Sequence, residues 1–532
     1  MRETFRASMG FLHTWSGILA SALLFAIFWM GTLSVFDKEI DQWMIPETRL
    51  PAPPQNISYD QFVPKVVDLA GGSTTYLYFR RPDARNPSLK SYYFDTKTEE
   101  YERATFNPVT GEQIETTDSL AGTGFIFPFH FSLHLRWNNV GYWLVGFAGM
   151  SMLVLIVSGI FIHRKIVQDF FTFRSTKKAR RLTLDLHNMT SLTALPFHFL
   201  FALTGLLIFA SIYLPLGVKS VAGDDEQGLY QEIYGSKQLT PANEPGELVS
   251  LDAMVAEATR LWTENGGYVG PPDNVRVSNV GDKNATVFVR NSFPSGRVAM
   301  NQNVTSFNGS TGEVIHNHVP SGTMATFSWL EGFHFVQFGH WPLRWLYFVA
   351  GLAGCAMMST GLIFWVQARI KKGAVDPLKV RSIRALTIGS TTGIIIATGA
   401  FFIANRVLPF EAEVAGFDRA QLEMWAFFVV WVGTFVHASL RGAVAWMDQS
   451  FAIAGASIAS VLLNWATTGD HLVATAVAGQ WAVFGMDMTL LAAAAIGVVS
   501  GVKARSVTAA KTLSEKSLKP KAAQPTGALP AE

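Results

Sequence analysis

The sequence has little of two residue classes on which many enzymes depend. It contains one cysteine, Cys355, which lies in an apolar run, so a disulfide framework and an iron–sulfur centre with cysteine ligands are excluded. Charged residues make up 15% of the 532 residues, whereas hydrophobic residues make up 49%. This composition is typical of a membrane protein and excludes a large soluble core.

Motifs of soluble catalytic sites are also lacking. The chain has no P-loop, no GxGxxG motif followed by a helix, no HExxH motif and no serine-nucleophile elbow. The loops expected on the cytoplasmic side are too short to fold a flavin or nicotinamide domain. If the protein transfers electrons, they must therefore come from a cytoplasmic reductase or from quinol in the membrane. No nucleic-acid partner is expected.

Long apolar runs are present instead. A helix needs about twenty apolar residues to cross the hydrocarbon of a bilayer, and eight such runs predict eight helices in contact with membrane lipid. They cover residues 11–35, 140–163, 187–215, 343–368, 385–406, 422–440, 451–468 and 479–502. The third run contains Pro196 and Pro215 and is expected to be kinked. The last contains Asp487, which is either an interfacial residue or a functional acid within the membrane.

Basic residues orient these helices. Residues 1–10, 163–186, 369–384, 441–450 and 503–532 together hold 22 of the 42 lysines and arginines. By the positive-inside rule these segments face the cytoplasm, so both termini are expected on the inner side of a bacterial inner membrane. The final segment, 503–532, is polar and rich in proline and alanine, and it is expected to be disordered.

Two long segments, 36–136 and 216–340, remain on the periplasmic side. Both contain short alternating runs, such as TTYLYFRR and ATVFVRN, and each predicts a small α+β domain. Each also contains a nearly identical turn, FNPVTGEQI at 106–114 and FNGSTGEVI at 307–315, in which glycine supplies the positive φ of a tight hairpin. The expected order is helix 1–35, domain 36–136, helix 137–164, loop 165–186, helix 187–215, domain 216–340, helix 341–368, loop 369–384, four further helices in 385–502, and tail 503–532.

One apolar stretch occurs twice. Residues 13–31 read HTWSGILASALLFAIFWMG and residues 187–205 read HNMTSLTALPFHFLFALTG, so each stretch begins with histidine and ends with glycine. The helix that follows each external domain is repeated as well. We therefore interpret residues 1–165 and 180–370 as two copies of helix, external domain and helix in the same orientation. Such a parallel internal repeat is expected to have a pseudo-twofold axis along the membrane normal.

The histidines fall into two layers. An unpaired histidine is poorly tolerated in hydrocarbon, so its recurrence at matched depth suggests a shared ligand. His13, His163 and His187 stand at the cytoplasmic ends of helices, and His130, His134, His334 and His340 stand at the outer ends. Two layers of neutral imidazoles suit two stacked haem groups, one near each face, with two histidine ligands each.

The pseudo-twofold axis predicts which histidines pair. It pairs His13 with His187 in the inner layer, and His334 with His134 or His130 in the outer layer. We prefer His134, because it follows leucine near the start of a helix, although the FHF pattern matches His130 to His334. For these residues the alternative is polar packing between helices.

Two further histidines are second candidates. His198 stands three turns after His187, about 16 Å further out by helical rise. It could ligate the outer haem, or it could hydrogen-bond within the bundle beside Pro196. His163 aligns with Trp365 of the other copy, and is expected to be an interface residue in preference to a ligand.

Several separated motifs resemble the PepSY-associated transmembrane family. They are RASMGFLHTWSGILAS in the first helix, LTLDLHNMTSL before the third, FSLHLRW and FHFVQFGHWPLRW before the second and fourth, and the TGE turns. The resemblance covers about residues 1–370 and implies a likeness to inner-membrane ferric-siderophore reductases, which bind haem b through membrane histidines. It carries His13, His187, His134 and His334 over as ligand candidates. The helices in 385–502 are a departure from the shorter, four-helix members of the family.

The resulting hypothesis is a dihaem b protein that reduces a ferric siderophore, or a similar ferric chelate, held between the periplasmic domains. Reduction releases iron because hard oxygen ligands bind iron(II) more weakly than iron(III). Two other classes remain open. One is a PepSY-type membrane anchor that binds a peptide or protease without redox activity, and the other is a transporter component, which the repeat and Asp487 suggest.

Overall fold

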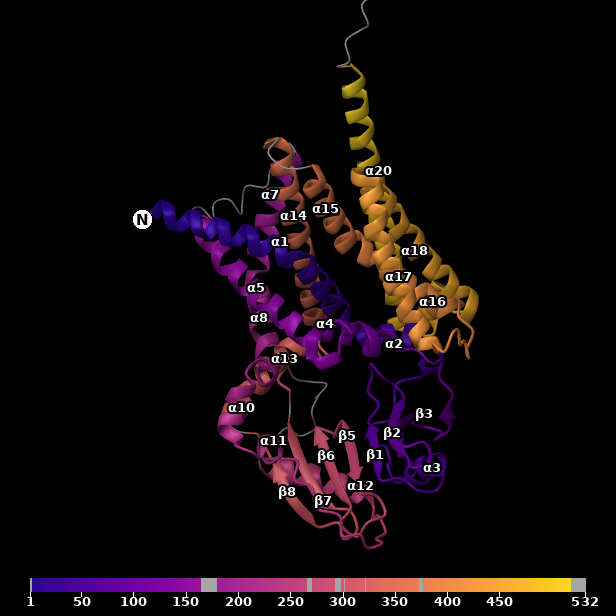
Figure 1. Ribbon diagram of the computed structural model, residues 1–532. Helices are drawn as coiled ribbons and strands as arrows, with labels where there is room; N and C mark the ends of the chain where they lie inside the picture. The colour runs from indigo at the N-terminus through magenta and orange to yellow at the C-terminus, as the bar shows by residue number, and fades with distance from the viewer. Residues whose placement is uncertain are drawn as a thin grey trace, which may run out of the picture.

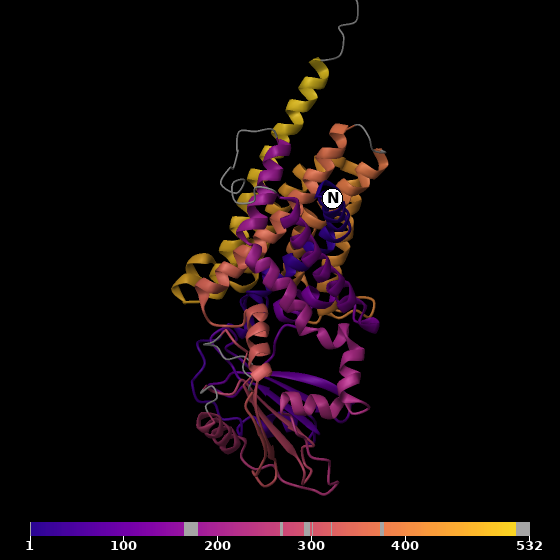
Figure 2. The same ribbon diagram turned by 90° about the vertical axis from the view of Figure 1, so that its left-hand side faces the viewer.

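The computed structural model describes residues 2–163, 179–265, 270–291, 298–300, 302–320, 322–372 and 377–517. Parts of the predicted loops 165–186 and 369–384 and of the tail therefore lie outside the described residues. In both views the helices form one end of the molecule and a β-sheet forms the other (Figure 1, Figure 2). The N-terminus and the far end of the last helix lie at the helical end, away from the sheet.

A first group of helices comes from the repeated part of the sequence. It contains α1 (Arg2–Ser34), α5 (Val140–Ile162), α7 (Ala179–Thr193), α8 (Leu195–Ile208) and α14 (Trp341–Lys372). Helix α1 packs against both α5 and α14, while α7 packs on α14 and α8 on α5. The chain bends by 64° between α7 and α8, immediately before Pro196, so the predicted kink in this run is present.

A second group of helices follows the repeated part. It contains α15 (Pro377–Ile388), the π-helical turn η4 (Gly389–Gly393), α16 (Ile394–Val407), α17 (Arg419–Arg441), the turn η5 (Gly442–Val444), α18 (Ala445–Thr468), α19 (Leu472–Val477) and α20 (Trp481–Ser517). Gly442, with φ of +61°, reverses the chain between α17 and α18. Gln449 Nε2 consequently donates to the carbonyl oxygen of Thr434 at 3.0 Å, a contact that a straight helix does not allow.

Six helices in the described residues are long and apolar enough to cross a membrane, or up to seven if the bent pair α7 and α8 forms one span. That count takes α17 and α18 together, as Arg419–Thr468. These helices place the chain among polytopic helical membrane proteins.

The last helix differs from the sequence prediction at its end. Helix α20 continues to Ser517, so residues 503–517 of the predicted disordered tail are helical. The reason is local, because KARSVTAAKTLSEKS contains several alanines and lysines, which favour a helix. Asp487, near the start of the same helix, is buried and accepts hydrogen bonds from Trp43 Nε1 at 2.8 Å and Asn464 Nδ2 at 3.3 Å, so it makes a polar contact inside the protein.

Short elements connect the helices to the sheet. They are α2 (Asp37–Met44), η1 (Pro46–Thr48), η2 (Ala121–Ile126), α4 (Phe127–Ser132), η3 (Trp137–Asn139), α9 (Ala210–Tyr213), α10 (Pro215–Ala222), α11 (Glu226–Tyr234) and α13 (Gly322–Phe335). Of these, α4 and α13 each precede one of the long helices, α5 and α14, and each carries an FHF sequence.

The two external segments form a single sheet. The first contributes α3 (Val63–Leu69), β1 (Tyr76–Arg80), β2 (Leu89–Asp95), β3 (Glu100–Phe106) and β4 (Gln113–Ile114), and the second contributes α12 (Leu251–Glu264), β5 (Asn274–Ser278), β6 (Thr286–Asn291), β7 (Asn303–Asn308) and β8 (Val314–His318). The order is β4-β3-β2-β1-β5-β6-β7-β8, with every neighbouring pair antiparallel. The sequence predicted two small domains, whereas in the structure β1 and β5 pair and share one core (Figure 1). The reason is that each four-stranded segment alone leaves an open strand edge, which the other segment covers.

The two halves make matching contacts across this junction. Asp252 accepts hydrogen bonds from Ser58 Oγ and the backbone N–H of Tyr59, while Asp60 accepts from Ser250 Oγ and the backbone N–H of Leu251. The two TGE turns are also alike. In each turn the asparagine side chain (Asn107 or Asn308) accepts from the backbone N–H groups two and three residues later.

A buried ion cluster joins the sheet end to the helices. Glu39 of α2 accepts hydrogen bonds from Arg85 at 2.8 Å and from Arg344 of α14, also at 2.8 Å. The Arg344 side chain is fully buried and that of Glu39 is 9% exposed. Burial by itself would raise the pKa of Glu39, but the hydrogen bonds and charges of the two arginines outweigh it and lower the pKa to about 2.

The protein is therefore expected to lose stability in acid through Glu39. Because its pKa is lower in the folded state than its ordinary value of 4.5, Glu39 adds about 3 kcal/mol at neutral pH, and this is lost as the pH falls from about 4.5 towards 2. A Glu39→Gln variant should unfold at a lower temperature at neutral pH and depend less on pH in the acid range. Tryptophan fluorescence of detergent-solubilised protein measures both curves. Parallel acid destabilisation of the two proteins would contradict this role of Glu39.

Candidate functional site

Two cavities lie between the helices of the first group. The cavity farther from the sheet, here called the inner cavity, has a volume of about 520 Å³ and is lined by His13, His187, His198 and His163. The outer cavity, nearer the sheet, has a volume of about 430 Å³ and is lined by His130 and His334. Most of the other lining side chains are apolar in both cavities. All three histidines of the predicted inner layer, His13, His163 and His187, line the inner cavity. Of the predicted outer layer, His130 and His334 line the outer cavity, whereas His134 and His340 are not among its lining residues.

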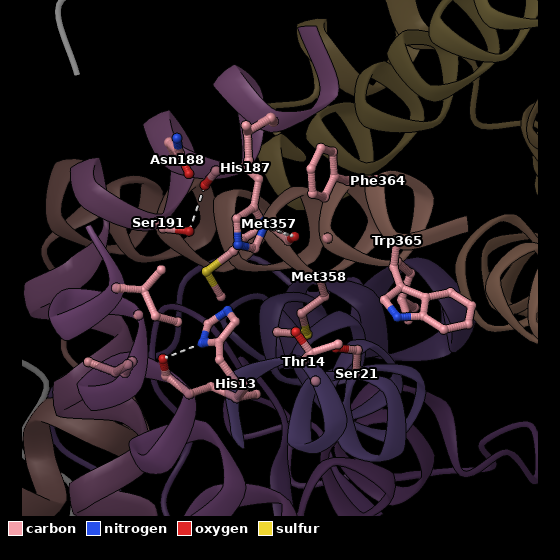
Figure 3. A pocket seen from close by; sticks show the side chains of 18 of the residues that line it. His13, Thr14, Ser21, His187, Asn188, Ser191, Met357, Met358, Phe364 and Trp365 are labelled. Atoms are coloured by element: carbon pink, nitrogen blue, oxygen red, sulfur yellow. Dashed lines mark hydrogen bonds between the residues drawn. The ribbon is translucent and has the colours of Figure 1, made fainter. Parts of the chain in front are cut away.

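His13 and His187 face one another in the inner cavity (Figure 3). Their ring centroids are 6.4 Å apart and their ring planes are inclined at 80°. His13 Nδ1 donates to the carbonyl oxygen of Leu155 in α5 at 3.0 Å, and His187 Nδ1 donates to the carbonyl oxygen of Met357 in α14 at 2.8 Å. A carbonyl can only accept, so each bond places the proton on Nδ1.

His130 and His334 make the corresponding pair in the outer cavity. Their ring centroids are 5.9 Å apart and their planes are inclined at 28°. His130 Nδ1 donates to the carbonyl oxygen of Ile27 in α1 at 2.8 Å. His334 Nδ1 donates to the hydroxyl oxygen of Thr204 in α8 at 2.9 Å, and this hydroxyl in turn donates to the carbonyl of Leu200.

A glycine of a neighbouring helix lies against each of these rings. A Cβ atom added to the glycine would lie 3.3 Å from the His13 ring at Gly159, 3.1 Å from the His187 ring at Gly361, 2.6 Å from the His130 ring at Gly31 and 2.9 Å from the His334 ring at Gly205. The carbonyls of Leu155, Met357 and Ile27 each stand four residues before the glycine, one turn away on the same helix face. One helix face thus supplies both the space for a ring and the acceptor that orients it.

These glycines are the residues that the sequence analysis missed. Gly31 and Gly205 were noticed only as the ends of the repeated stretch. Gly159 and Gly361 also occupy matching places, in SGIFI and TGLIF of the second repeated helix. Comparing glycines as well as histidines between the two copies would have found all four.

The arrangement leaves Nε2 of each paired histidine available. Among the described residues it has no hydrogen-bond partner, so its lone pair is free to bind a metal. Two imidazoles that bind one metal ion through nitrogen place their ring centroids about 6 Å apart, since each metal–nitrogen bond is about 2 Å. The spacings in the two cavities, 6.4 and 5.9 Å, fit this requirement.

The ligand count favours a cofactor over a bare metal ion. Within the described parts of the chain, no group of three or more histidine, cysteine, aspartate or glutamate side chains could hold a metal ion. Each cavity brings together one close pair of histidines, His13 with His187 and His130 with His334. A haem brings its own four equatorial nitrogens and needs two axial ligands, so the residues present fit this group.

His134 does not pair with His334, which differs from our preferred sequence prediction. Its Nε2 donates to the carbonyl oxygen of Phe125 at 2.8 Å, and its ring stacks on that of Phe125 at 4.8 Å. Leu133 and His134 have φ angles of 53° and 56°, so the chain turns sharply after α4 and directs His134 away from the outer cavity. His130 occupies the place beside His334, as the FHF pattern indicated.

The second candidates lie at the borders of the inner cavity. His198 is 1% exposed, its Nε2 donates to the carbonyl oxygen of Ala350 at 3.2 Å, and its ring lies 5.7 Å from that of Phe28. Phe28 lines the outer cavity, while Leu24 and Met152 line both. His198 therefore belongs to the partition between the cavities. His163 follows the last residue of α5 and lines the inner cavity.

Two arginines, from α7 and α14, also line the inner cavity. The guanidinium of Arg180 lies 5.3 Å above the ring of Phe364, and that of Arg369 lies 5.3 Å above the ring of Trp365. Each guanidinium retains donors that can pair with carboxylates of a bound group.

Comparison with known proteins covers the part of the chain that contains the paired histidines and the glycines beside them. The sequence model of a family described as the PepSY-associated TM region matches residues 11–368. An uncharacterized protein of Pseudomonas aeruginosa is 25% identical over 372 residues, which cover 66% of this chain and 88% of that relative. Helices α15 to α20 lie beyond the family match.

Proposed function

The chain belongs to the PepSY-associated TM region family, and from this premise we propose that it is a haem b oxidoreductase of the bacterial inner membrane. It carries electrons across the bilayer and reduces a ferric siderophore, or a similar ferric chelate, on the side of the sheet. The observation that carries this proposal is the pair of matched histidine sites, in which each Nδ1–H is held by a neighbouring helix and the two ring centroids lie 6.4 Å apart in the inner pair and 5.9 Å apart in the outer pair.

The proposed topology puts the sheet in the periplasm. The described residues of the basic segments, 2–10, 179–186, 369–372 and 377–384, lie at the end of the helices away from the sheet, and the positive-inside rule directs that end to the cytoplasm. Counting α7 with α8 as one span and α17 and α18 as two gives eight crossings with both termini inside. The matching contacts of the two halves support a parallel repeat about a pseudo-twofold axis.

The chain's own residues hold and enclose the cofactors. His13 with His187, and His130 with His334, would each hold one haem group, and the carbonyls of Leu155, Met357 and Ile27 keep three of these rings in the tautomer that leaves Nε2 unprotonated. When bound, haem supplies an iron that can alternate between the ferric and ferrous states and so carry one electron at a time. Two histidine ligands for each group would suit electron transfer more than binding of oxygen or substrate.

The proposed function needs an electron donor and a ferric acceptor. Electrons come from quinol or from a cytoplasmic reductase, because the chain has no flavin or nicotinamide motif of its own. One electron converts chelated iron(III) to iron(II), which hard oxygen ligands hold far less tightly, so iron is released for uptake.

A visible spectrum of the detergent-purified protein tests this function. We expect a b-type absorption band that appears on reduction with dithionite, and a pyridine haemochrome assay that gives two haem groups per chain. The reduced protein should then be reoxidised by a ferric chelate, with iron(II) trapped by a coloured chelator. Protein purified without any reducible band would contradict the proposal and favour a PepSY-type membrane anchor.

A further inference from the structure

A third cavity lies between the sheet and the helices. This sheet-side cavity has a volume of about 360 Å³. Its lining includes Lys38 and Asp41 of α2, Arg80 of β1, and Phe127 and Phe335 of α4 and α13. The site of paired histidines does not include it.

The sheet-side cavity shares a wall with the outer cavity. Phe127 and Phe335 line both cavities, and their ring centroids are 6.2 Å apart. His130 stands three residues after Phe127 in α4, and His334 directly precedes Phe335 in α13. A molecule in the sheet-side cavity is therefore separated from the outer histidine pair by these two aromatic side chains.

The sheet turns a basic face towards this cavity. Arg80 lies opposite Lys90 in the β1–β2 pair, and Tyr92 lies opposite Arg103 in the β2–β3 pair. All four line the cavity. Alternate residues of β1, such as Leu77 and Phe79, point into the apolar core on the other side.

The two aspartates that line the cavity already have polar partners within the protein. Asp37 lies 3.3 Å from Arg85, and Asp41 accepts from the backbone N–H of Thr123 at 3.0 Å and from its hydroxyl at 2.6 Å.

Two cations have no carboxylate partner. Lys38 donates to the neutral amide of Gln337, and Arg80 has no hydrogen-bond or ion-pair partner among the described residues. Burial lowers the pKa of Lys38 to about 8, although the nearby Asp37 carboxylate opposes this shift.

We propose that the sheet-side cavity is the acceptor site and that it selects a negatively charged ferric chelate, built from catecholate, phenolate or carboxylate groups, over a neutral hydroxamate chelate. This rests on the proposed function. The chelate would enter with iron(III), gain one electron by way of a haem group held by His130 and His334, and become one unit more negative. Cations beside it stabilise that added charge, so Arg80 and Lys38 favour the reduced complex as well as binding of the oxidised one.

Gallium(III) complexes separate binding from reduction, because gallium(III) has the charge of iron(III) but accepts no electron under these conditions. Titration calorimetry of full-length protein in detergent compares an anionic gallium tris-catecholate with a neutral gallium trihydroxamate. We expect the anionic complex to bind at least about tenfold more tightly, and Arg80→Gln to weaken its binding by about tenfold, as loss of a charge-assisted contact does. Arg80→Lys should restore most of the affinity.

Arg260→Gln is the matched control. It removes the same charge from α12, which packs on the other face of the sheet, where Arg260 is half exposed and paired with Glu257 and Glu264. The proposal would be overturned if the protein bound the two gallium complexes equally well or bound neither. It would also be overturned if Arg260→Gln weakened binding of the anionic complex as much as Arg80→Gln does. If protein without a b-type band still binds the anionic complex in an Arg80-dependent way, the site is retained and the redox function is rejected. If haem-loaded protein binds neither complex, only this site is rejected.

Discussion

Replacing His187 with alanine is expected to halve the haem content, from two groups per chain to one. In the inner cavity the ring centroid of His187 lies 6.4 Å from that of His13, and both side chains are needed to hold iron from its two sides. His198 cannot replace the lost ligand in its observed position, because its Nε2 donates to the carbonyl of Ala350. The pyridine haemochrome assay on purified variants measures the ratio of haem to protein directly.

Combined variants test whether each histidine pair holds its own haem group. His13→Ala, His187→Ala and the double variant should all retain one haem, because either change alone already empties the inner site. Combining His187→Ala with His334→Ala should remove both groups, because the two residues belong to different cavities. A His13→Ala variant that keeps two haem groups, or an inner double variant that loses both, would contradict the assignment of one haem to each pair.

The depth of each histidine could be predicted from the sequence for physical reasons. Membrane helices have a fixed rise per residue, and the basic loops fix their direction, so a histidine near one end of an apolar run has a known level in the bilayer. The penalty for an unpaired imidazole in hydrocarbon then predicts that histidines at one level meet, as His13 and His187 do. The sequence places residues along helices in this way, and the structure adds which faces meet.

The choice between His130 and His134 needed information that periodicity does not carry. The two residues are one turn apart in sequence, and a regular helix would have kept both on one face. The chain instead leaves the helix at Leu133, where two successive residues adopt positive φ, and only the three-dimensional structure shows where the second side chain then points. A local break in backbone geometry thus decides which of the two histidines lies beside His334.

The sequence did not predict that the two external segments pair into one sheet, and the reason is a different one. The alternation in TTYLYFRR and ATVFVRN correctly predicted strands β1 and β6. It says nothing about strand edges, and β1 and β5 are separated by almost two hundred residues. The aspartates that join the halves, Asp60 and Asp252, resemble ordinary turn residues in the sequence, and their function as acceptors for the opposite half depends on the assembled fold.

The sharpest test of the outer site compares His130→Ala with His134→Ala. The first variant removes an imidazole that faces His334 at 5.9 Å, and is expected to lose the outer haem completely. The second removes a ring that stacks on Phe125 outside the cavity, so it should keep two haem groups and lose only about 1 kcal/mol of stability from its hydrogen bond. Haem content and the thermal unfolding temperature, measured on the same preparations, separate the two effects.

Electron paramagnetic resonance shows which of the two haem groups is lost. The relative orientation of two axial imidazole planes influences the splitting of the iron d orbitals, and the planes are inclined at 28° in the outer pair but at 80° in the inner pair. The oxidised protein should therefore give two low-spin signals, of which His130→Ala loses one and His187→Ala the other, while His134→Ala keeps both. If His134→Ala lost the same signal as His334→Ala, and His130→Ala kept it, the chain would have to adopt a different turn after α4 when the cofactor is bound. The ligand would then be the residue that the leucine–histidine pattern originally favoured.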